Sequence, residues 1–219
     1  MIKKIISMKF DFKEDYKYPF FLISLVCFLF VPSLVGSTHT QTIGNILYIV
    51  LIISSLALIS AESKITRIIV YFVGISSIIL ELVNKFIFTF GSTIQVIFVV
   101  IIFAYFIALF TELLSQIFKS KTITLNLIMG AFTGYILIGI IGHFIFRLIF
   151  FLDPSSFAIS SESHNELIYY TFITLTTIGY GDISPLSEAA RNFAMLLGLI
   201  GQFYNSVIIA IIIGKFLQK

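Results

Sequence analysis

Six long apolar stretches constrain this chain more than any other feature of its sequence. They run over residues 19–36, 43–60, 65–83, 92–117, 123–152 and 191–217, with short polar segments between the first five and a longer segment before the last. A helix needs about 20 predominantly apolar residues to cross a bilayer. The chain is 58% hydrophobic and only 11% charged, whereas an ordinary soluble domain carries about 25% charged residues. We therefore expect an all-α membrane protein with six transmembrane helices and little room for a soluble domain.

The most specific motif lies between the last two stretches. Residues 176–182 read Thr-Thr-Ile-Gly-Tyr-Gly-Asp, and this run resembles the selectivity-filter signature of the potassium channel superfamily. Its residue types suit a filter in which backbone carbonyls replace the water around a potassium ion. Gly179 and Gly181 reach backbone angles that most L-residues avoid, and those angles aim successive carbonyls at one axis. Gly-Tyr-Gly-Asp alone would also suit a Gly-rich reverse turn.

The resemblance implies that four consecutive backbone carbonyls coordinate K⁺, those of Thr177, Ile178, Gly179 and Tyr180. The Thr177 hydroxyl can add an oxygen at the inner end. The side chains of Ile178 and Tyr180 are expected to point away from the ion and pack against the support behind the filter. The residues implied to support the filter are Thr176, Gly181, Asp182, Tyr169 and Tyr170, with Asp182 at the outer mouth and the two tyrosines as a bracing aromatic pair.

One filter strand cannot encircle an ion. The chain holds one such motif and no internal repeat of it. Four copies around an axis are therefore required, and we expect a homotetramer that passes K⁺ and holds no organic cofactor.

The resemblance also places a re-entrant pore helix over residues 166–177, between the fifth and sixth spans. This helix would point its C-terminus into the membrane, where the negative end of its dipole favours a cation. Ile173 stands where some channels hold a carboxylate bonded to the outer aspartate. That role is therefore not expected in this chain.

The last apolar stretch is expected to form the inner helix of the pore and to hold its gate and cavity residues. Gly201 stands where relatives carry a hinge glycine, Gly198 is a rival three residues earlier, and close packing explains either equally well. Asn205 follows Gly201 by one helical turn and is expected to line a water-filled cavity. Bulky apolar side chains from Ile209 to Ile213 would narrow the inner mouth, and such a constriction gates by dewetting.

The distribution of lysine and arginine predicts the orientation of the spans, because cytoplasmic loops carry the excess of cations. With the N-terminus inside, only Lys85 and Arg191 fall clearly on the outer side. The cations expected inside are Lys3, Lys4, Lys9, Lys13, Lys17, Lys64, Arg67, Lys119, Lys121, Lys215 and Lys219. We therefore expect a multi-pass protein of the plasma membrane, in contact with its lipids, with both termini in the cytoplasm.

The first four spans occupy the place of the peripheral domain in six-span channels. Voltage-gated relatives carry cations along the fourth span, and each gating charge contributes about 2.3 kcal/mol per 100 mV. Residues 92–114 hold no lysine or arginine; their one charge is Glu112. We expect no steep voltage gating.

The chain divides into three parts. These are an N-terminal cytoplasmic segment, 1–18, which is either amphipathic or a solvated tail, a four-helix peripheral domain, 19–118, and a pore domain, 119–219.

The sequence thus predicts a potassium-selective channel that conducts passively through a homotetrameric pore. Two alternatives keep the same spans: a weakly selective cation channel, and a transport or regulatory subunit that does not conduct alone. The sequence offers no metal-binding cluster, nucleophile triad or phosphate loop. It therefore does not predict an enzyme, and the net charge of +3 gives no reason to expect a nucleic acid partner.

Overall fold

The computed structural model describes residues 16–35, 40–59, 64–86, 92–120, 122–159 and 164–217. Within these ranges the chain is helical apart from its turns and one isolated antiparallel bridge, between Phe157 and Pro185. The elements are α2 (Lys17–Leu34), α3 (Thr40–Leu56), α4 (Lys64–Phe86), α5 (Ser92–Lys119), α6 (Leu125–Leu152), a 3₁₀ turn η1 (Pro154–Ser156), α7 (His164–Leu175) and α8 (Glu188–Leu217). The expected amphipathic segment lies mostly outside the described residues.

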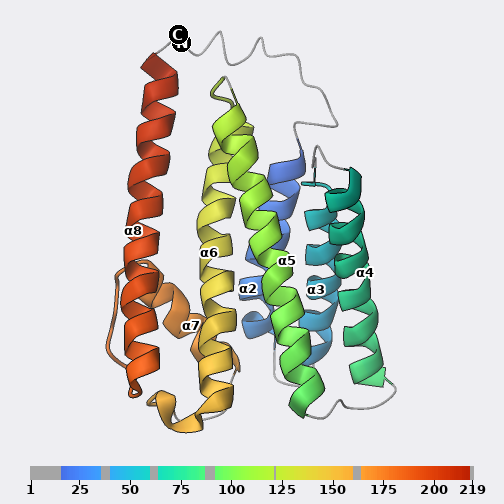
Figure 1. Cartoon of the computed structure of the whole chain (residues 1–219), viewed down its shortest axis with the longest axis vertical. Coiled ribbons are helices and arrows are strands. Elements are labelled where there is room, and N and C mark those ends of the chain that lie inside the picture. The colour runs from blue at the N-terminus through green and yellow to red at the C-terminus, as the bar shows by residue number, and fades with distance from the viewer. Residues whose placement is uncertain are drawn as a thin grey trace.

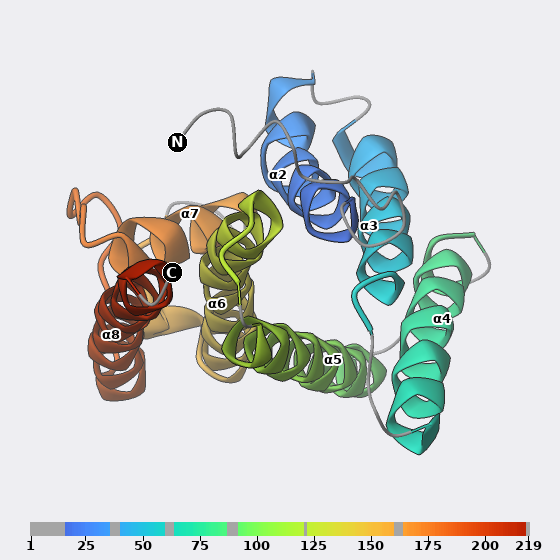
Figure 2. The same cartoon turned by 90° about the horizontal axis from the view of Figure 1, so that it is seen from above.

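Helix α6 is the centre of the molecule. It packs against α7 and α8 on one side and against α5 and α2 on the other, while α3 lies beside α2 and α4 contacts α3 and α5. Figure 1 shows the long helices running side by side, and Figure 2 shows the two groups meeting along α6. Helices α5 and α8 both finish at the same end of the molecule (Figure 1). Helix α7 lies towards the opposite end, which is called the Asp153 end because α6 finishes there.

Three of the described helices are long and apolar enough to cross a membrane. They are the stretches Val96–Lys119, Leu125–Leu152 and Glu188–Leu217, whereas α2, α3 and α4 carry shorter apolar stretches of 10 to 17 residues. The helices occupy the places of the six apolar stretches in the sequence. A crossing by each of the first three stays a prediction.

Two of the predicted boundaries that differ from the structure lie next to the motif. Helix α7 spans His164–Leu175 rather than 166–177, because Thr177 has a φ of +61° and a left-handed residue cannot continue a right-handed helix. Helix α8 begins at Glu188 rather than at Arg191. The Ser187 Oγ accepts a hydrogen bond from the Ala190 backbone N–H at 3.2 Å, and this N-cap starts the helix earlier.

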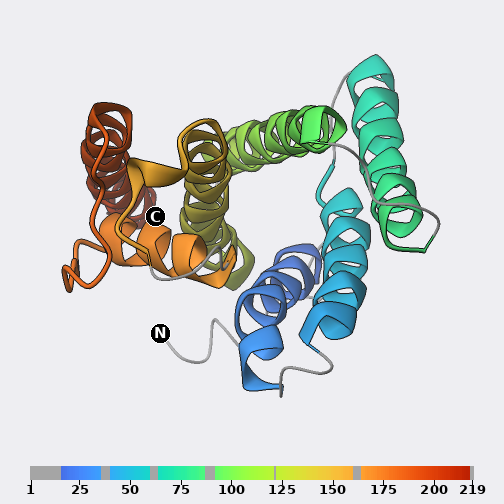
Figure 3. The same ribbon diagram turned by 90° about the horizontal axis from the view of Figure 1, so that it is seen from below.

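Glycines of α6 let the neighbouring helices approach closely. A Cβ added at Gly139 would stand 2.6 Å from the ring of Phe172 on α7, and one added at Gly142 would stand 2.9 Å from Leu197 on α8. These distances are shorter than van der Waals contact, so neither position accepts a side chain without displacing its neighbour. Figure 3 shows the result from the Asp153 end, with α7 lying across the space between α6 and α8.

We predict that Gly139→Ala destabilises the fold by about 1–3 kcal/mol, the usual result of overpacking. The matched control is Gly214→Ala on α8, where an added Cβ meets nothing within 4 Å; it should stabilise the helix by up to about 1 kcal/mol. Scanning calorimetry of the detergent-solubilised protein measures both. Equal unfolding temperatures for the two variants would contradict the packing described here.

Candidate functional site

The segment 176–182, called the filter segment below, leaves the end of α7 in an unusual backbone conformation. The φ angle is +61° at Thr177, +53° at Gly179 and +82° at Gly181, and these are the only positive φ angles among the described residues. Every second residue is therefore left-handed. For a β-branched residue such as Thr177 this conformation is an outlier and costs about 1–2 kcal/mol, so the surroundings must hold it in place.

Hydrogen bonds to the end of α7 hold this conformation. The Thr177 N–H donates to the Thr174 carbonyl at 3.0 Å, and the Gly179 N–H donates to the Ile173 carbonyl at 3.1 Å. The Thr176 hydroxyl donates to the Phe172 carbonyl at 2.6 Å. In a run of alternating handedness the N–H groups gather on one side. Here the N–H groups of Thr177 and Gly179 both point back to α7.

The filter segment lies on the surface of the single chain. The side chains of Ile178 and Tyr180 are 54% and 73% exposed, and a Cβ added at Gly179 or Gly181 would meet nothing within 4 Å. In Figure 1 and Figure 2 the loop after α7 lies on the side of the molecule remote from α3 and α4. The expectation that Ile178 and Tyr180 pack against a support is therefore not met within one chain.

At the far end of the filter segment, Tyr169 is bound to Asp182. The Tyr169 hydroxyl donates to Oδ2 of Asp182 at 2.7 Å, which joins the first half of α7 to the end of the filter segment. This hydrogen bond, with a smaller contribution from burial, raises the pKa of Tyr169 to about 12. The phenol therefore stays protonated and keeps donating well above neutral pH.

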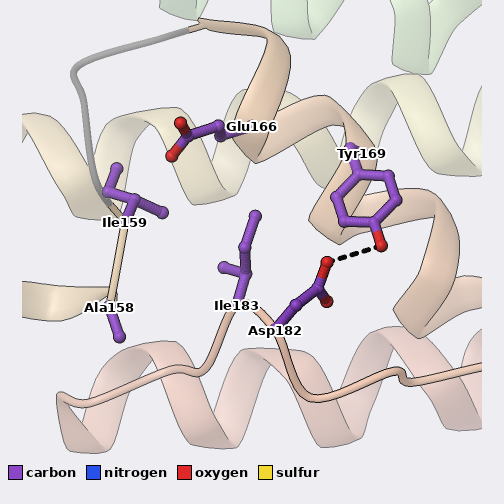
Figure 4. A pocket seen from close by; sticks show the side chains of 6 residues that line it. All are labelled: Ala158, Ile159, Glu166, Tyr169, Asp182 and Ile183. Carbon is purple, nitrogen blue, oxygen red and sulfur yellow. Dashed lines mark hydrogen bonds between the residues drawn. The ribbon is translucent and has the colours of Figure 1, made fainter.

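A hollow of about 380 Å³ adjoins this hydrogen bond. Figure 4 shows Glu166 and Asp182 on it, with the side chain of Ile183 between them. Its full lining is Ala158, Ile159, Glu166, Tyr169, Asp182 and Ile183. Two carboxylates beside the end of the filter segment make this region attractive to cations.

Tyr170 is buried in an aromatic cluster that fixes α7 against its neighbours. Its ring centroid lies 5.0 Å from that of Phe146 on α6 and 5.4 Å from that of Phe157 after η1. Phe193 of α8 completes the cluster, 5.0 Å from Phe146. Backbone hydrogen bonds between the Phe157 segment and the residues after the filter segment, such as Ala158 N–H to Ser184 O at 2.9 Å, close the same region.

The other end of α7 is held at Leu175. The Tyr135 hydroxyl of α6 donates to the Leu175 carbonyl at 3.0 Å. A Cβ added at Gly201 of α8 would stand 2.9 Å from the same carbonyl, whereas one added at Gly198 would stand 4.0 Å from its nearest neighbour, the Thr174 carbonyl. Gly201 is therefore a position of close packing and Gly198 is not. A hinge at either stays a prediction.

The remaining predicted residues lie further along α8. Asn205 follows Gly201 by one turn and is half-buried. Ile209 and Ile213 are 57% and 53% exposed in the single chain. Their assignment to the cavity and the gate stays a prediction.

Sequence reasoning missed Tyr135 and Lys215. Tyr135 lies in the fifth apolar stretch, and its partner is a backbone carbonyl 40 positions away. Lys215 counted only as a cation of the inner side, yet it donates to carbonyls of α5. A backbone carbonyl carries no signature in the sequence, so neither contact could have been found from residue types.

A comparison with known families agrees with this geometry. Residues 128–219 match the family model described as Ion channel, which covers less than half of the chain and includes nearly all of α6, α7, the filter segment and α8. No solved structure matches the chain. The match supports an ion channel in a membrane and suggests a protein that is not an enzyme.

We predict that the ionisation of Tyr169 depends on Asp182. Because its folded pKa of about 12 exceeds the ordinary value of 10.0, the hydrogen bond contributes fully below about pH 10 and is lost as the pH rises through about 12. Asp182→Asn should bring the pKa back towards 10. Carbon NMR of ring-labelled tyrosine, assigned with Tyr169→Phe, measures it.

Asp153→Asn is the matched control, since that carboxylate lies at the same end of the molecule and accepts from Ser155 instead. It should leave the titration of Tyr169 as it is. A pKa that is the same in Asp182→Asn and in the unaltered protein would contradict the hydrogen bond.

Proposed function

We propose that this chain is the subunit of a potassium-selective channel. Four copies surround one pore, and K⁺ passes through it down its electrochemical gradient. The observation that carries the proposal is the alternating backbone of the filter segment, with positive φ at Thr177, Gly179 and Gly181. It occurs in the seven residues whose sequence resembles a potassium filter.

In this proposal the backbone carbonyls of the filter segment replace the water of the ion. Carbonyls from residues 177–180 of four chains form successive rings, and the Thr177 hydroxyl adds an oxygen at the inner end. Carbonyl oxygens are neutral, so an ion is bound without a fixed charge that would trap it. Binding is then strong enough for entry and weak enough for exit.

Exposed apolar surfaces of the single chain provide a face on which neighbouring copies can pack. Ile178 and Tyr180 of the filter segment are exposed, and so are three residues of α8, Met195 at 62%, Leu199 at 69% and Phe203 at 72%. These three residues are four apart and share one face of the helix. Packing against neighbouring chains would cover this face and complete the support that one chain lacks.

The charges near the filter segment favour a cation. The C-terminal end of α7 lies at the base of the filter segment, where the negative end of its dipole attracts positive charge. Asp182 and Glu166 provide carboxylates at the opposite end. Both termini are proposed to be cytoplasmic, with six spans, so the carboxylates would face the outside of the cell.

The proposed test is flux from liposomes containing the purified protein, with K⁺ compared with Na⁺. We expect K⁺ flux well above Na⁺ flux. Gly179→Ala should abolish selectivity or conduction, because a left-handed alanine costs about 1–2 kcal/mol in each of four chains. Gly44→Ala in α3 is the control and should conduct normally, since its Cβ comes no closer than 4.0 Å to another residue.

The outcomes separate the alternatives. Similar K⁺ and Na⁺ flux would favour a weakly selective cation channel. The absence of flux from intact tetramers would favour a subunit that does not conduct alone. Normal selectivity in Gly179→Ala would contradict the assignment of the filter.

We also predict that voltage does not open this channel steeply. Before Lys119, helix α5 carries no lysine or arginine, so no cationic gating charge on this helix crosses the field. Bilayer recordings should show an open probability that changes less than about threefold between −100 and +100 mV, against the many-fold change that several gating charges produce. A steep rise over this range would show a sensor elsewhere in the chain.

A further inference from the structure

Lys215, in the last turn of α8, is bonded to the end of α5. Its Nζ donates to the Ile117 carbonyl at 2.7 Å and to the Phe118 carbonyl at 3.3 Å, across 98 positions of the sequence. The end of α5 and the last turn of α8 are thus joined directly by an ammonium group.

The two carbonyls are a suitable partner for a cation. The last four carbonyls of a helix have no partner within it, and the negative end of the helix dipole gathers there. In α5 the Gln116 carbonyl accepts from the Ser120 N–H at 3.1 Å. The next two carbonyls accept from Lys215, so α8 provides the C-terminal cap of α5.

The same turn of α5 also holds α2 and α3. Gln116 Nε2 donates to the Leu58 carbonyl, just after α3, at 2.7 Å. The Tyr18 hydroxyl of α2 donates to Gln116 Oε1. The last turns of α5 therefore contact α2, the end of α3 and α8 through hydrogen bonds. A displacement of α2 or α3 would reach α8 through only a few such bonds.

A second contact between α8 and α5 lies nearer the middle of α8. The Tyr204 ring packs against Phe110 of α5 at 6.1 Å, and its hydroxyl donates to the Ala131 carbonyl of α6 at 2.7 Å. Tyr204 and Lys215 are eleven positions apart, about three helical turns, and so share one face of α8. Ile209 and Ile213 lie between these two contacts along the helix, and both are exposed.

We propose that Lys215 couples the peripheral helices to the gate. The bond holds the end of α8 towards α5, and the filter segment lies on a different side of α8 (Figure 1; Figure 2). A pull towards α5 therefore moves Ile209 and Ile213 away from the pore axis and favours the open state. This inference rests on the proposed channel function and gives the four-helix domain, which lacks gating charges, a mechanical role.

The test compares three variants in single-channel recordings. Lys215→Met keeps the length of the side chain and removes the donors, and should lower the open probability at least about threefold with no change in unitary conductance. Lys215→Arg keeps the charge and donors and should restore it. Lys119→Met removes a charge from the last turn of α5 itself but leaves the bond from α8 in place, and should lower the open probability less than Lys215→Met does.

Conductance reports the filter and open probability reports the gate, so a general structural defect would change both. An open probability in Lys215→Met that equals or exceeds that of the unaltered protein overturns the proposal. So does an equal fall in Lys119→Met, because the effect would then follow the charge and not the bond.

Hydrogen–deuterium exchange tests the bond without relying on conduction. The segment 112–120 should exchange several-fold faster in Lys215→Met than in the unaltered protein or in Lys215→Arg, because the helix end loses its cap. If the unaltered protein does not conduct, the proposed function fails. The exchange rates of segment 112–120 still decide whether the bond exists. Equal exchange in all variants overturns the coupling even where K⁺ flux is normal.

Discussion

The left-handed backbone of Thr177, Gly179 and Gly181 is the constraint around which the candidate site is built. Glycine accepts such angles at little cost, but a threonine does not. The strain persists because the end of α7 accepts hydrogen bonds from the N–H groups of Thr177 and Gly179. A strained residue held in this manner commonly marks a functional site, and here it lies in the motif that resembles a potassium filter.

Helix α7 can hold the filter segment because it is itself fixed at its C-terminal end and in its middle. Tyr135 binds the carbonyl of Leu175 at the end, and Tyr170, in the middle of the helix, is packed among the rings of Phe146 and Phe157. Gly139 lets α7 lie directly on α6. The long apolar helices therefore position a short segment whose own side chains are largely exposed, and we propose that neighbouring copies complete its support.

The sequence was sufficient for the parts that depend on residue type. Helices occupy the places of all six apolar stretches, and the two glycines of the motif have the positive φ angles that their type permits. The sequence was not sufficient for Thr177, because threonine rarely adopts a left-handed backbone and its residue type does not predict one. The predicted end of the pore helix was therefore wrong by two residues. Nor do apolar stripes separate lipid-facing from chain-facing residues, since both are apolar. Contacts such as that of Lys215 with backbone carbonyls leave no pattern to read.

The central claim is that carbonyls of residues 177–180 from four chains bind K⁺ on a common axis. The most direct measurement is an experimental structure of the assembled protein with Tl⁺ or Rb⁺ in place of K⁺, since these ions are electron-dense. The account predicts fourfold symmetry and a column of ion density encircled by those carbonyls. Chains without a fourfold axis, or ions bound away from these carbonyls, would contradict it.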